Sequence, residues 1–365
     1  MKALDGQHVT GDAVLIVGNS GGTNIGESLV RAASQLGLRV GFVDALRAMD
    51  APVWVRRANW YLRGRRPTWL RRSSSQVVEQ VQTQRPQWLL TTGFAPCTRR
   101  DLERIGRTGV VRINYMTDDP FNPSVRAPWF LAALPEYDYV FSARRANMDD
   151  VRGLGCRRVM YQPFGYDPAH QYPEASADPD RRGDSCDVLF VGGGDSDRVP
   201  YIATLIEHGF RVGLYGDYWE RFSATRACTR GHADPGTVRR ATATAKICLC
   251  IVRKANRDGN TMRSFEIPAT SGCMLAEDTG EHRDIFGADG DAVVYFRSLS
   301  DMVRKAGWLL EHPEERTRLA AAAHALVTRG GHSYRDRLVA MLAGHEFTPA
   351  TAAPHTGARI QSAVE

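Results

Sequence analysis

The feature that most constrains the fold is one local pattern that occurs twice: a short apolar run followed by a glycine-rich loop. It appears as AVLIVG (13–18) followed by NSGGTN (19–24), and again as CDVLFVGGGDSD (186–197). An apolar run that ends in glycine is typical of a strand buried on both faces of a parallel sheet. Helical patterns and further apolar runs alternate after each copy, which indicates crossover units. The sequence therefore predicts two Rossmann-like α/β halves.

The segment between the two copies predicts the domain boundary. Residues 167–185, DPAHQYPEASADPDRRGDS, are rich in proline, aspartate and serine and have no periodicity, as expected of a linker. We expect an N-terminal domain over 1–178, a C-terminal domain over 186–332, a last helical segment over 333–347 and a disordered tail over 348–365. Ligands of such sheets bind beyond the carboxyl ends of the strands, so two facing halves would form a binding cleft.

Composition excludes several classes of protein. The 365 residues are 43% hydrophobic and 24% charged, which is typical of a globular protein and not of a disordered chain. No apolar run approaches the ~20 residues of a membrane-spanning helix, and the first residues do not resemble a signal peptide. The seven cysteines include no CxxC pair, so neither a disulfide framework nor a zinc site is expected. A reducing cytoplasm is the expected compartment.

Residues 253–278, RKANRDGNTMRSFEIPATSGCMLAED, carry the most chemistry. Asp258 and Glu266 flank a small polar loop, and Asn260 or Thr261 can cap the helix that follows. The free N–H groups of such a helix start favour phosphate. Glu266 can accept hydrogen bonds from ribose hydroxyls, whereas Asp258 would lie nearer a transferred group. The same segment holds four cations that suit a diphosphate: Arg253, Lys254, Arg257 and Arg263.

This segment resembles the group 1 glycosyltransferases of the GT-B fold, most closely the spore maturation protein B-like branch. The branch's motif R-x-F-E-x-P-A-x-x-G-x-x-L is present from Arg263 to Leu275. The branch's later landmarks follow in order: the acidic turn Glu277–Asp278, IFGADGDAVVYF (285–296), HPEER (312–316), and His332, Tyr334 and Arg337. The resemblance is specific over about 186–345. It is weaker in the first half, where MTDDPFNP (116–123) and residues 138–168 still fit.

The resemblance implies an α/β protein of GT-B fold, with two Rossmann-like domains facing each other across a cleft and the last helix crossing back to the first domain. It implies transfer of a sugar from a UDP, GDP or TDP donor, bound mainly by the C-terminal domain. No metal and no cofactor beyond this co-substrate are expected, because cations and a helix start can stabilise the leaving diphosphate.

Individual roles follow from the same resemblance. Glu266 matches the acid that contacts the donor ribose. Asp258 matches the first acid of the E-x7-E pair, although it is an aspartate and one methylene shorter. Arg198, which follows the loop of Gly193 and Gly194, matches a diphosphate-binding arginine. The family's lysine partner is either Lys254 or Arg253 in this chain.

Two places in the first half are candidates for the acceptor side. Asn19, Gly21 and Gly22 lie in the first glycine loop, where they would contact acceptor or diphosphate or serve only a tight turn. Asp118 and Asp119 follow a strand end in YMTDDP. Either can act as an acceptor-side general base; the alternative is a turn set by Pro120.

Residues 54–72, WVRRANWYLRGRRPTWLRR, contain seven arginines and no acids. Arginine with tryptophan suits an anionic membrane interface, or an acceptor site in which a ring such as that of Trp60 stacks on sugars. Single-stranded nucleic acid is a less favoured partner, and a solvated helix is the plain alternative. The acceptor is left open among small molecules, polysaccharides and lipid-linked molecules.

The expected protein is thus a cytoplasmic glycosyltransferase, peripheral to the inner face of the membrane if residues 54–72 bind lipid. Two alternatives stay open. One is a nucleotide-sugar epimerase or hydrolase of the same fold. The other is a non-catalytic nucleotide- or nucleic-acid-binding protein.

Overall fold

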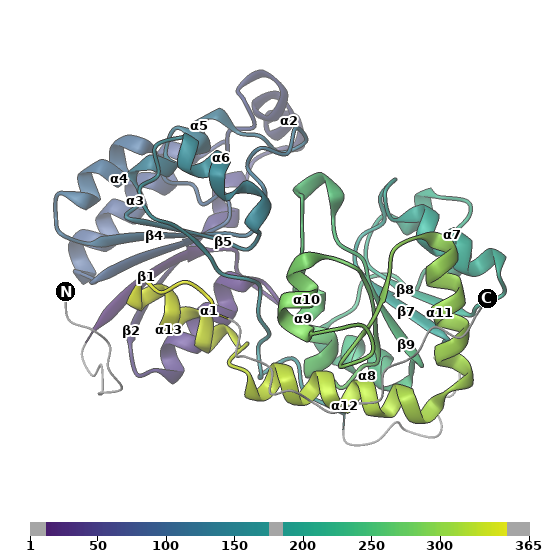
Figure 1. Cartoon of the computed structure of the whole chain (residues 1–365). Coiled ribbons are helices and arrows are strands. Elements are labelled where there is room, and N and C mark those ends of the chain that lie inside the picture. The colour runs from purple at the N-terminus through teal and green to yellow at the C-terminus, as the bar shows by residue number, and fades with distance from the viewer. Residues whose placement is uncertain (1–11, 175–184, 349–365) are drawn as a thin grey trace. The chain divides into compact units, whose positions relative to one another are not determined.

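The structure, a computed structural model, describes residues 12–174 and 185–348 (Figure 1). These residues form two compact α/β units, each built on one parallel sheet. The first unit holds the described residues up to Phe164, with Ala255–Asp258 and Tyr334–Phe347. The second holds Gly165–Lys254 and Gly259–Ser333, apart from the undescribed residues between 174 and 185. The predicted class, α/β with two parallel-sheet domains, is confirmed.

The sheet of the first unit has the strand order β2-β1-β3-β4-β5-β6. Its strands are β1 (Ala13–Gly18), β2 (Arg39–Asp44), β3 (Trp88–Thr92), β4 (Val111–Met116), β5 (Tyr139–Ser142) and β6 (Val159–Tyr161). Leu15 of β1 pairs with Gly41 on one side and with Leu89 on the other. The strand order reverses at β1 and β3, so the loops that follow these strands border the switch point, where ligands bind in such sheets.

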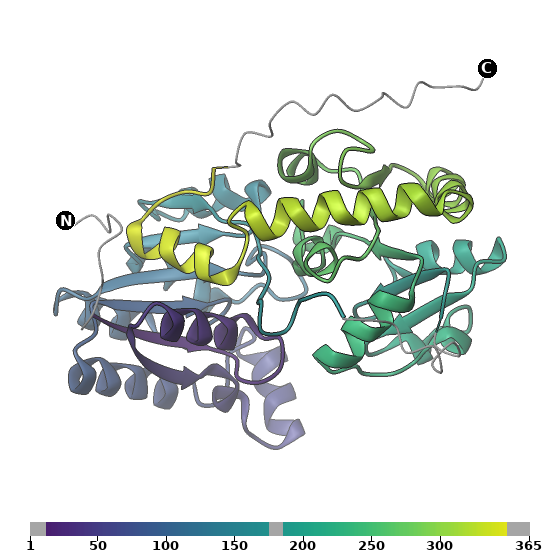
Figure 2. The same ribbon diagram turned by 90° about the horizontal axis from the view of Figure 1, so that it is seen from below.

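Helices cover both faces of this sheet, which is why every residue of β1 is buried. Figure 1 shows α1 and α13 on one face and α3 and α4 on the other. Helix α13 packs against α1 (Figure 2). The helices of the unit are α1 (Ile25–Gln35), α2 (Val53–Leu62), α3 (Leu70–Gln84), α4 (Arg99–Gly106), α5 (Pro128–Leu131), α6 (Met148–Gly153) and α13 (Tyr334–Ala343).

The second sheet has the strand order β11-β10-β9-β7-β8. Its strands are β7 (Val188–Val191), β8 (Val212–Tyr215), β9 (Ile247–Cys250), β10 (Met274–Glu277) and β11 (Val294–Phe296). Its core joins strand residues such as Phe190 and Leu275 to Leu309 of α11. The helices are α7 (Val199–Glu207), α8 (Pro235–Thr244), α9 (Met262–Ala269), α10 (Gly280–Phe286), α11 (Leu299–Glu311) and α12 (Pro313–Arg329).

The unit boundaries differ in detail from the predicted domains. The first stretch of the first unit ends at Phe164, whereas the predicted N-terminal domain ends at 178. Residues 165–174 pack with the second unit, where Arg239 Nε binds Glu174 at 2.9 Å. Helix α13 lies in the first unit, and its role as a helix that crosses back stays a prediction. The rest of the predicted linker, 175–184, and the predicted tail from 349 on lie outside the described residues. Within the described residues, no helix is both long and apolar enough to cross a bilayer.

Candidate functional site

The loop after β7 is built on close backbone contacts. Trp219, which is fully buried, donates from Nε1 to Gly192 O at 2.7 Å, and Gly194 N donates to Asp217 O at 2.9 Å. A Cβ on Gly194 would lie 2.9 Å from the Trp219 ring, whereas one on Gly193 would have no neighbour nearer than 3.6 Å. Gly194 is therefore required for packing, and Gly193 is the open position where a ligand can approach the backbone.

We expect Gly194→Ala to destabilise the protein by about 1–3 kcal/mol, because the added methyl overpacks against a buried ring. Gly193→Ala is the matched control, with the same change in a neighbouring open position. Thermal unfolding of both variants measures the difference. Equal midpoints for the two variants would show that the Trp219 contact does not shape this loop.

Two arginines are held at the carboxyl end of β7. Arg198, the residue before α7, donates from Nη1 to Gly193 O at 3.1 Å, and its guanidinium lies over the Phe190 ring. Arg263 of α9 donates from Nε to Val191 O at 3.0 Å. Their side chains are 11% and 28% exposed. The structure thus brings two predicted diphosphate ligands, 65 residues apart in the chain, to the same strand end.

Helix α9 presents the predicted ribose ligand beside one of these arginines. Thr261 is the N-cap, and its N–H donates to Ser264 Oγ at 2.9 Å. Glu266 is buried and pairs with Arg263 Nη1. Asn260, the other capping candidate, instead donates from Nδ2 to Glu281 Oε2 at 2.5 Å. The helix start and its carboxylate are therefore fixed by side chains within the unit.

His282 contacts the first turn of α9 through Ser264. The sequence analysis did not identify this histidine. Its Nδ1 lies 2.8 Å from Glu277 O, and its Nε2 lies 2.8 Å from Ser264 Oγ. Because the carbonyl can only accept, Nδ1 carries the proton and Nε2 accepts from the Ser264 hydroxyl. Burial lowers the pKa of His282 to about 4. The imidazole is therefore neutral at physiological pH and serves as an acceptor.

This histidine predicts a loss of stability in acid. The unfolded imidazole has an ordinary pKa near 6.5, so the unfolded state binds the extra proton first as the pH falls. The contribution of neutral His282 to the free energy of unfolding is complete above pH ~6.5 and is lost as the pH falls towards ~4. The loss amounts to about 3 kcal/mol. We expect His282→Asn to lose this part of the pH dependence, measured by denaturant unfolding across that range. The exposed His208→Asn is the control, and an unchanged slope in His282→Asn would contradict the assignment.

Lys254 and Arg253 are both exposed, and Lys254 is the more firmly placed. Its Nζ lies 5.4 Å from the centre of the Tyr201 ring, and the hydrogen bond to Tyr201 raises the pKa of the lysine. Tyr201 in turn donates to Glu277 Oε1 at 2.9 Å, at the end of β10. Lys254 is thus held near the carboxyl edge of the second sheet, which favours it over Arg253 as the lysine partner that the resemblance implies.

In the first unit, Asp258 forms a buried ion pair. Arg144 Nε donates to Asp258 Oδ1 at 2.8 Å, and Arg144 Nη2 donates to Thr117 O at 2.8 Å. The two paired side chains are 1% and 8% exposed. Arg144 Nη1 is buried and has no hydrogen-bond partner among the described residues. The guanidinium therefore depends on Asp258 for its charge compensation.

The acids that follow β4 have different surroundings. Asp119 is 1% exposed and accepts from Arg257 Nε at 2.6 Å and from Arg257 Nη2 at 3.1 Å. Asp118 is half-buried, and its Oδ1 lies 3.4 Å from Asn256 Nδ2. Among the described residues it has no arginine or lysine partner. Of the three candidate aspartates, Asp118 is the one without a lysine or arginine partner in the described part of the chain.

The first glycine loop is shaped by turn geometry. Gly21 and Gly22 have φ of +86° and +58° and, like Asn19, are exposed. A Cβ on Gly18 would lie 2.9 Å from Gly26 Cα. Gly18 and Gly26 therefore allow the end of β1 to contact the start of α1. They were not predicted as a pair, although the spacing G-x7-G could have indicated it. Asn19, Gly21 and Gly22 stay predictions as acceptor contacts.

Trp60 is partly covered within the first unit, and its contact with an acceptor stays a prediction. It is half-buried, and the Arg65 guanidinium lies over its ring at 5.6 Å from the centre. One face of the ring is therefore already used within the protein. The described residues contain no cluster of histidine, cysteine, aspartate and glutamate that could hold a metal ion.

Comparison with known proteins bears on the family and on the fold. Residues 199–343 match the model of the family described as glycosyl transferase-like. No curated protein matches the sequence significantly. Sucrose-phosphate synthase from Thermosynechococcus elongatus has a similar structure, with TM-score 0.65 and 10% identity over 91% of this chain and 97% of that one.

Two further structures extend the comparison. Anabaena HepE in complex with UDP-glucose superimposes with TM-score 0.60 and 11% identity, over 91% of this chain and 99% of that one. A putative UDP-N-acetylglucosamine 2-epimerase from Listeria monocytogenes superimposes with TM-score 0.53 and 11% identity, over 90% of this chain and 93% of that one. The fold is therefore that of the GT-B glycosyltransferases. The nearer resemblance to the spore maturation protein B-like branch stays a prediction.

Proposed function

We propose that the protein transfers a glycosyl group from a nucleoside diphosphate sugar to an acceptor, and that its second unit binds the donor. The observation that carries the proposal is the anchoring of Arg198 and Arg263 on residues 191–193, next to the open Gly193. A leaving diphosphate gains negative charge in the transition state, and fixed cations aimed at that charge lower the barrier. The N–H groups at the start of α9 act in the same sense.

Each candidate residue has a role in this proposal. Arg198, Arg263 and Lys254 stabilise the diphosphate. The exposed Arg253 is the alternative to Lys254. The carboxylate of Glu266, oriented by Arg263, accepts from the ribose hydroxyls. These cations supply the positive charge, so the reaction is metal-independent.

Asp118 is the proposed base that takes the proton from the acceptor hydroxyl, because it is the one of the three aspartates without a paired cation among the described residues. Asp119 and Asp258 instead neutralise Arg257 and Arg144 and shape the edge of the first sheet. A carboxylate held in a strong ion pair is a poor base, because the neighbouring cation stabilises its deprotonated form.

The donor class is tested by offering UDP-, GDP- and TDP-glucose with and without a cell-derived acceptor fraction. The uridine donor is the first choice, because HepE, which shares the fold, binds UDP-glucose. We expect nucleoside diphosphate release that depends on the acceptor. Release without acceptor would indicate a hydrolase, and a changed sugar without release would indicate an epimerase. Binding with no turnover under any condition would indicate a non-catalytic protein.

Asp118→Asn separates the base from the donor site. We expect it to lower the rate of transfer by about 100-fold, as is usual for loss of a general base, and to leave the affinity for the donor unchanged. Asp149→Asn, in an exposed helix turn of the same unit, is the control. A normal transfer rate in Asp118→Asn would exclude Asp118 as the base.

A further inference from the structure

Helix α2 of the first unit exposes several large apolar side chains. Its buried side chain is a polar one, Asn59, whereas its exposed side chains include Trp54 (74%), Tyr61 (79%) and Leu62 (83%). Trp54, Ala58 and Tyr61 follow one another at spacings of four and three, so they share one side of the helix. A helix that faces water normally turns its polar side outward. This surface is therefore matched to a medium other than water.

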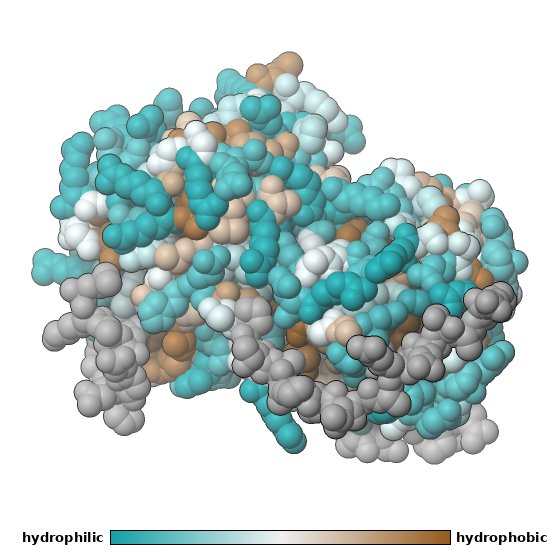
Figure 3. All heavy atoms as spheres, viewed as in Figure 1, coloured by the Kyte–Doolittle hydropathy of each residue, from teal (hydrophilic) through white to brown (hydrophobic). Residues whose placement is uncertain are grey.

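The exposed apolar side chains of the described residues concentrate here. Ten large hydrophobic side chains are exposed, and five of them are Val53, Trp54, Tyr61, Leu62 and Trp69. Figure 3 shows brown spheres at the end of the first unit where Figure 1 labels α2, on a face that is otherwise mainly hydrophilic. Such a concentration marks an interaction site more often than a scatter of single residues does.

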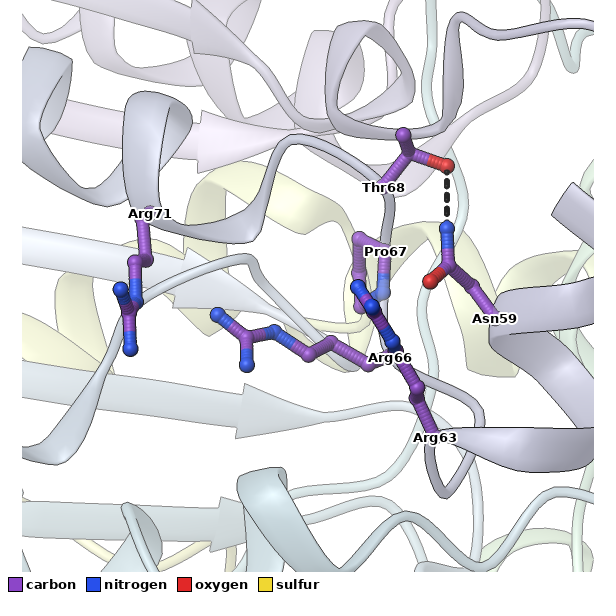
Figure 4. Close-up of a pocket in the computed structure, with 6 residues that line it drawn as sticks. All are labelled: Asn59, Arg63, Arg66, Pro67, Thr68 and Arg71. Atoms are coloured by element: carbon purple, nitrogen blue, oxygen red, sulfur yellow. Dashed lines mark hydrogen bonds between the residues drawn. The ribbon is translucent and has the colours of Figure 1, made fainter. Parts of the chain in front are cut away.

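A pocket of about 300 Å³ lies beside this helix, between α2 and α3. It is lined by Asn59, Arg63, Arg66, Pro67, Thr68 and Arg71. Asn59 Nδ2 donates to Thr68 Oγ1 at 3.1 Å at its edge, and Figure 4 shows the guanidinium group of Arg66 drawn between those of Arg63 and Arg71. None of the three arginine side chains has an ion pair or hydrogen bond within the described residues. Three unpaired cations with no acid in the lining fit an anion of high charge density, such as phosphate.

The loop that carries the pocket is held in place by another arginine. Arg65, with φ of +57°, donates to Arg126 O and to Pro123 O, both at 2.6 Å. Trp69 Nε1 donates to Asp50 O at 2.7 Å at the far end of the loop. Arg65 thus fixes the loop, whereas Arg63, Arg66 and Arg71 remain available to bind a ligand.

We propose that residues 53–72, the α2–α3 surface, dock on a bilayer that contains anionic phospholipid, and that the arginine pocket holds a lipid phosphate. The apolar side chains of α2 enter the boundary between headgroups and acyl chains. Arg56, Arg57 and Arg72, which are exposed, face the headgroups together with the pocket. Charge complementarity favours this occupant, because the surface has seven arginines and no acid. Nucleic acid is the less favoured partner, because exposed aliphatic side chains such as Leu62 offer no platform for base stacking.

Co-sedimentation with vesicles tests the docking. We expect the full chain to bind vesicles of mixed phosphatidylcholine and phosphatidylglycerol and not vesicles of phosphatidylcholine alone. The triple variant Arg63→Gln/Arg66→Gln/Arg71→Gln should bind the mixed vesicles about 100-fold more weakly. The control Arg100→Gln/Arg104→Gln/Arg107→Gln removes the same charge from exposed positions of α4 and of the residue that follows it and should bind as the unaltered chain does.

Three outcomes would overturn the proposal: no binding to mixed vesicles, equal binding to both kinds of vesicle, or equal loss in the two triple variants. Binding of a single-stranded oligonucleotide that the pocket variant loses, without vesicle binding, would assign the surface to nucleic acid. Trp54→Ser/Leu62→Ser supplies a second test. It leaves every arginine in place and should still weaken vesicle binding, whereas a purely electrostatic surface would bind as before.

Discussion

Asp258→Asn should lower the free energy of unfolding by about 3 kcal/mol, because removing one partner of a buried ion pair leaves the other charge uncompensated. Arg144 is the charge in question; its side chain is 1% exposed, and one of its terminal nitrogens already has no partner among the described residues. The amide of asparagine keeps the shape of the carboxylate and can still accept a hydrogen bond, but it removes the negative charge. Thermal or denaturant unfolding measures the effect.

The control is Asp149→Asn, which breaks an aspartate–arginine pair in the same unit. That pair joins Asp149 to Arg152 at 2.7 Å, with side chains 96% and 48% exposed. Exposed pairs contribute only ~0–1 kcal/mol, so the control should unfold almost as the unaltered chain does. If Asp258→Asn were as stable as the control and yet inactive, Asp258 would act on the substrate and the structural role would be wrong.

Arg198→Ala should reduce the turnover number of glycosyl transfer by about 100-fold, since losing one fixed donor to a developing negative charge has an effect of that order. The control is Arg239→Ala in α8, because the two arginine side chains are 11% and 13% exposed. Arg239 binds Glu174 and His170 O, and neither contact involves the loop after β7. Steady-state kinetics with the donor that gives turnover compares the two variants.

An equal loss of turnover in both variants would mean that the loss comes from a less stable second unit and not from removal of the cation after β7. A rate in Arg198→Ala close to that of the unaltered chain would remove Arg198 from the diphosphate site. Addition of guanidinium ions offers an independent check. It should restore part of the turnover of Arg198→Ala and none in Arg239→Ala, because only the former lacks a cation at the reacting group.

Local patterns explain why most of the fold was predictable. The strand predicted over 13–18 coincides with β1, and the helical segment predicted over 333–347 contains α13, Tyr334–Ala343. Both rest on the periodicity or composition of a few consecutive residues. The last strand of the first sheet, β6, is short and spans Val159–Tyr161. Pro163 follows this strand and cannot extend it, because proline has no N–H to pair with a neighbouring strand.

Pairings between distant residues explain what was not predictable. Asp258 and Arg144 are 114 residues apart, and Asp119 and Arg257 are 138 apart. The chain contains 47 lysines and arginines, so no local pattern indicates which of them neutralises a given aspartate. The sequence could therefore only propose Asp118, Asp119 and Asp258 as candidates, whereas burial and ion pairing in the structure distinguish them. Ser264 and His282 were missed for the same reason, since 18 residues separate them.

Calorimetric titration of the full chain with UDP, GDP and TDP tests most directly whether the second unit binds a nucleoside diphosphate. We predict one-to-one binding of at least one of them, weakened by more than ~1 kcal/mol, or about fivefold, in Glu266→Gln, because a charge-assisted hydrogen bond to the ribose is lost. Asp149→Asn should bind as the unaltered chain does. Absence of binding by all three nucleotides, or equal affinity in Glu266→Gln, would contradict the account.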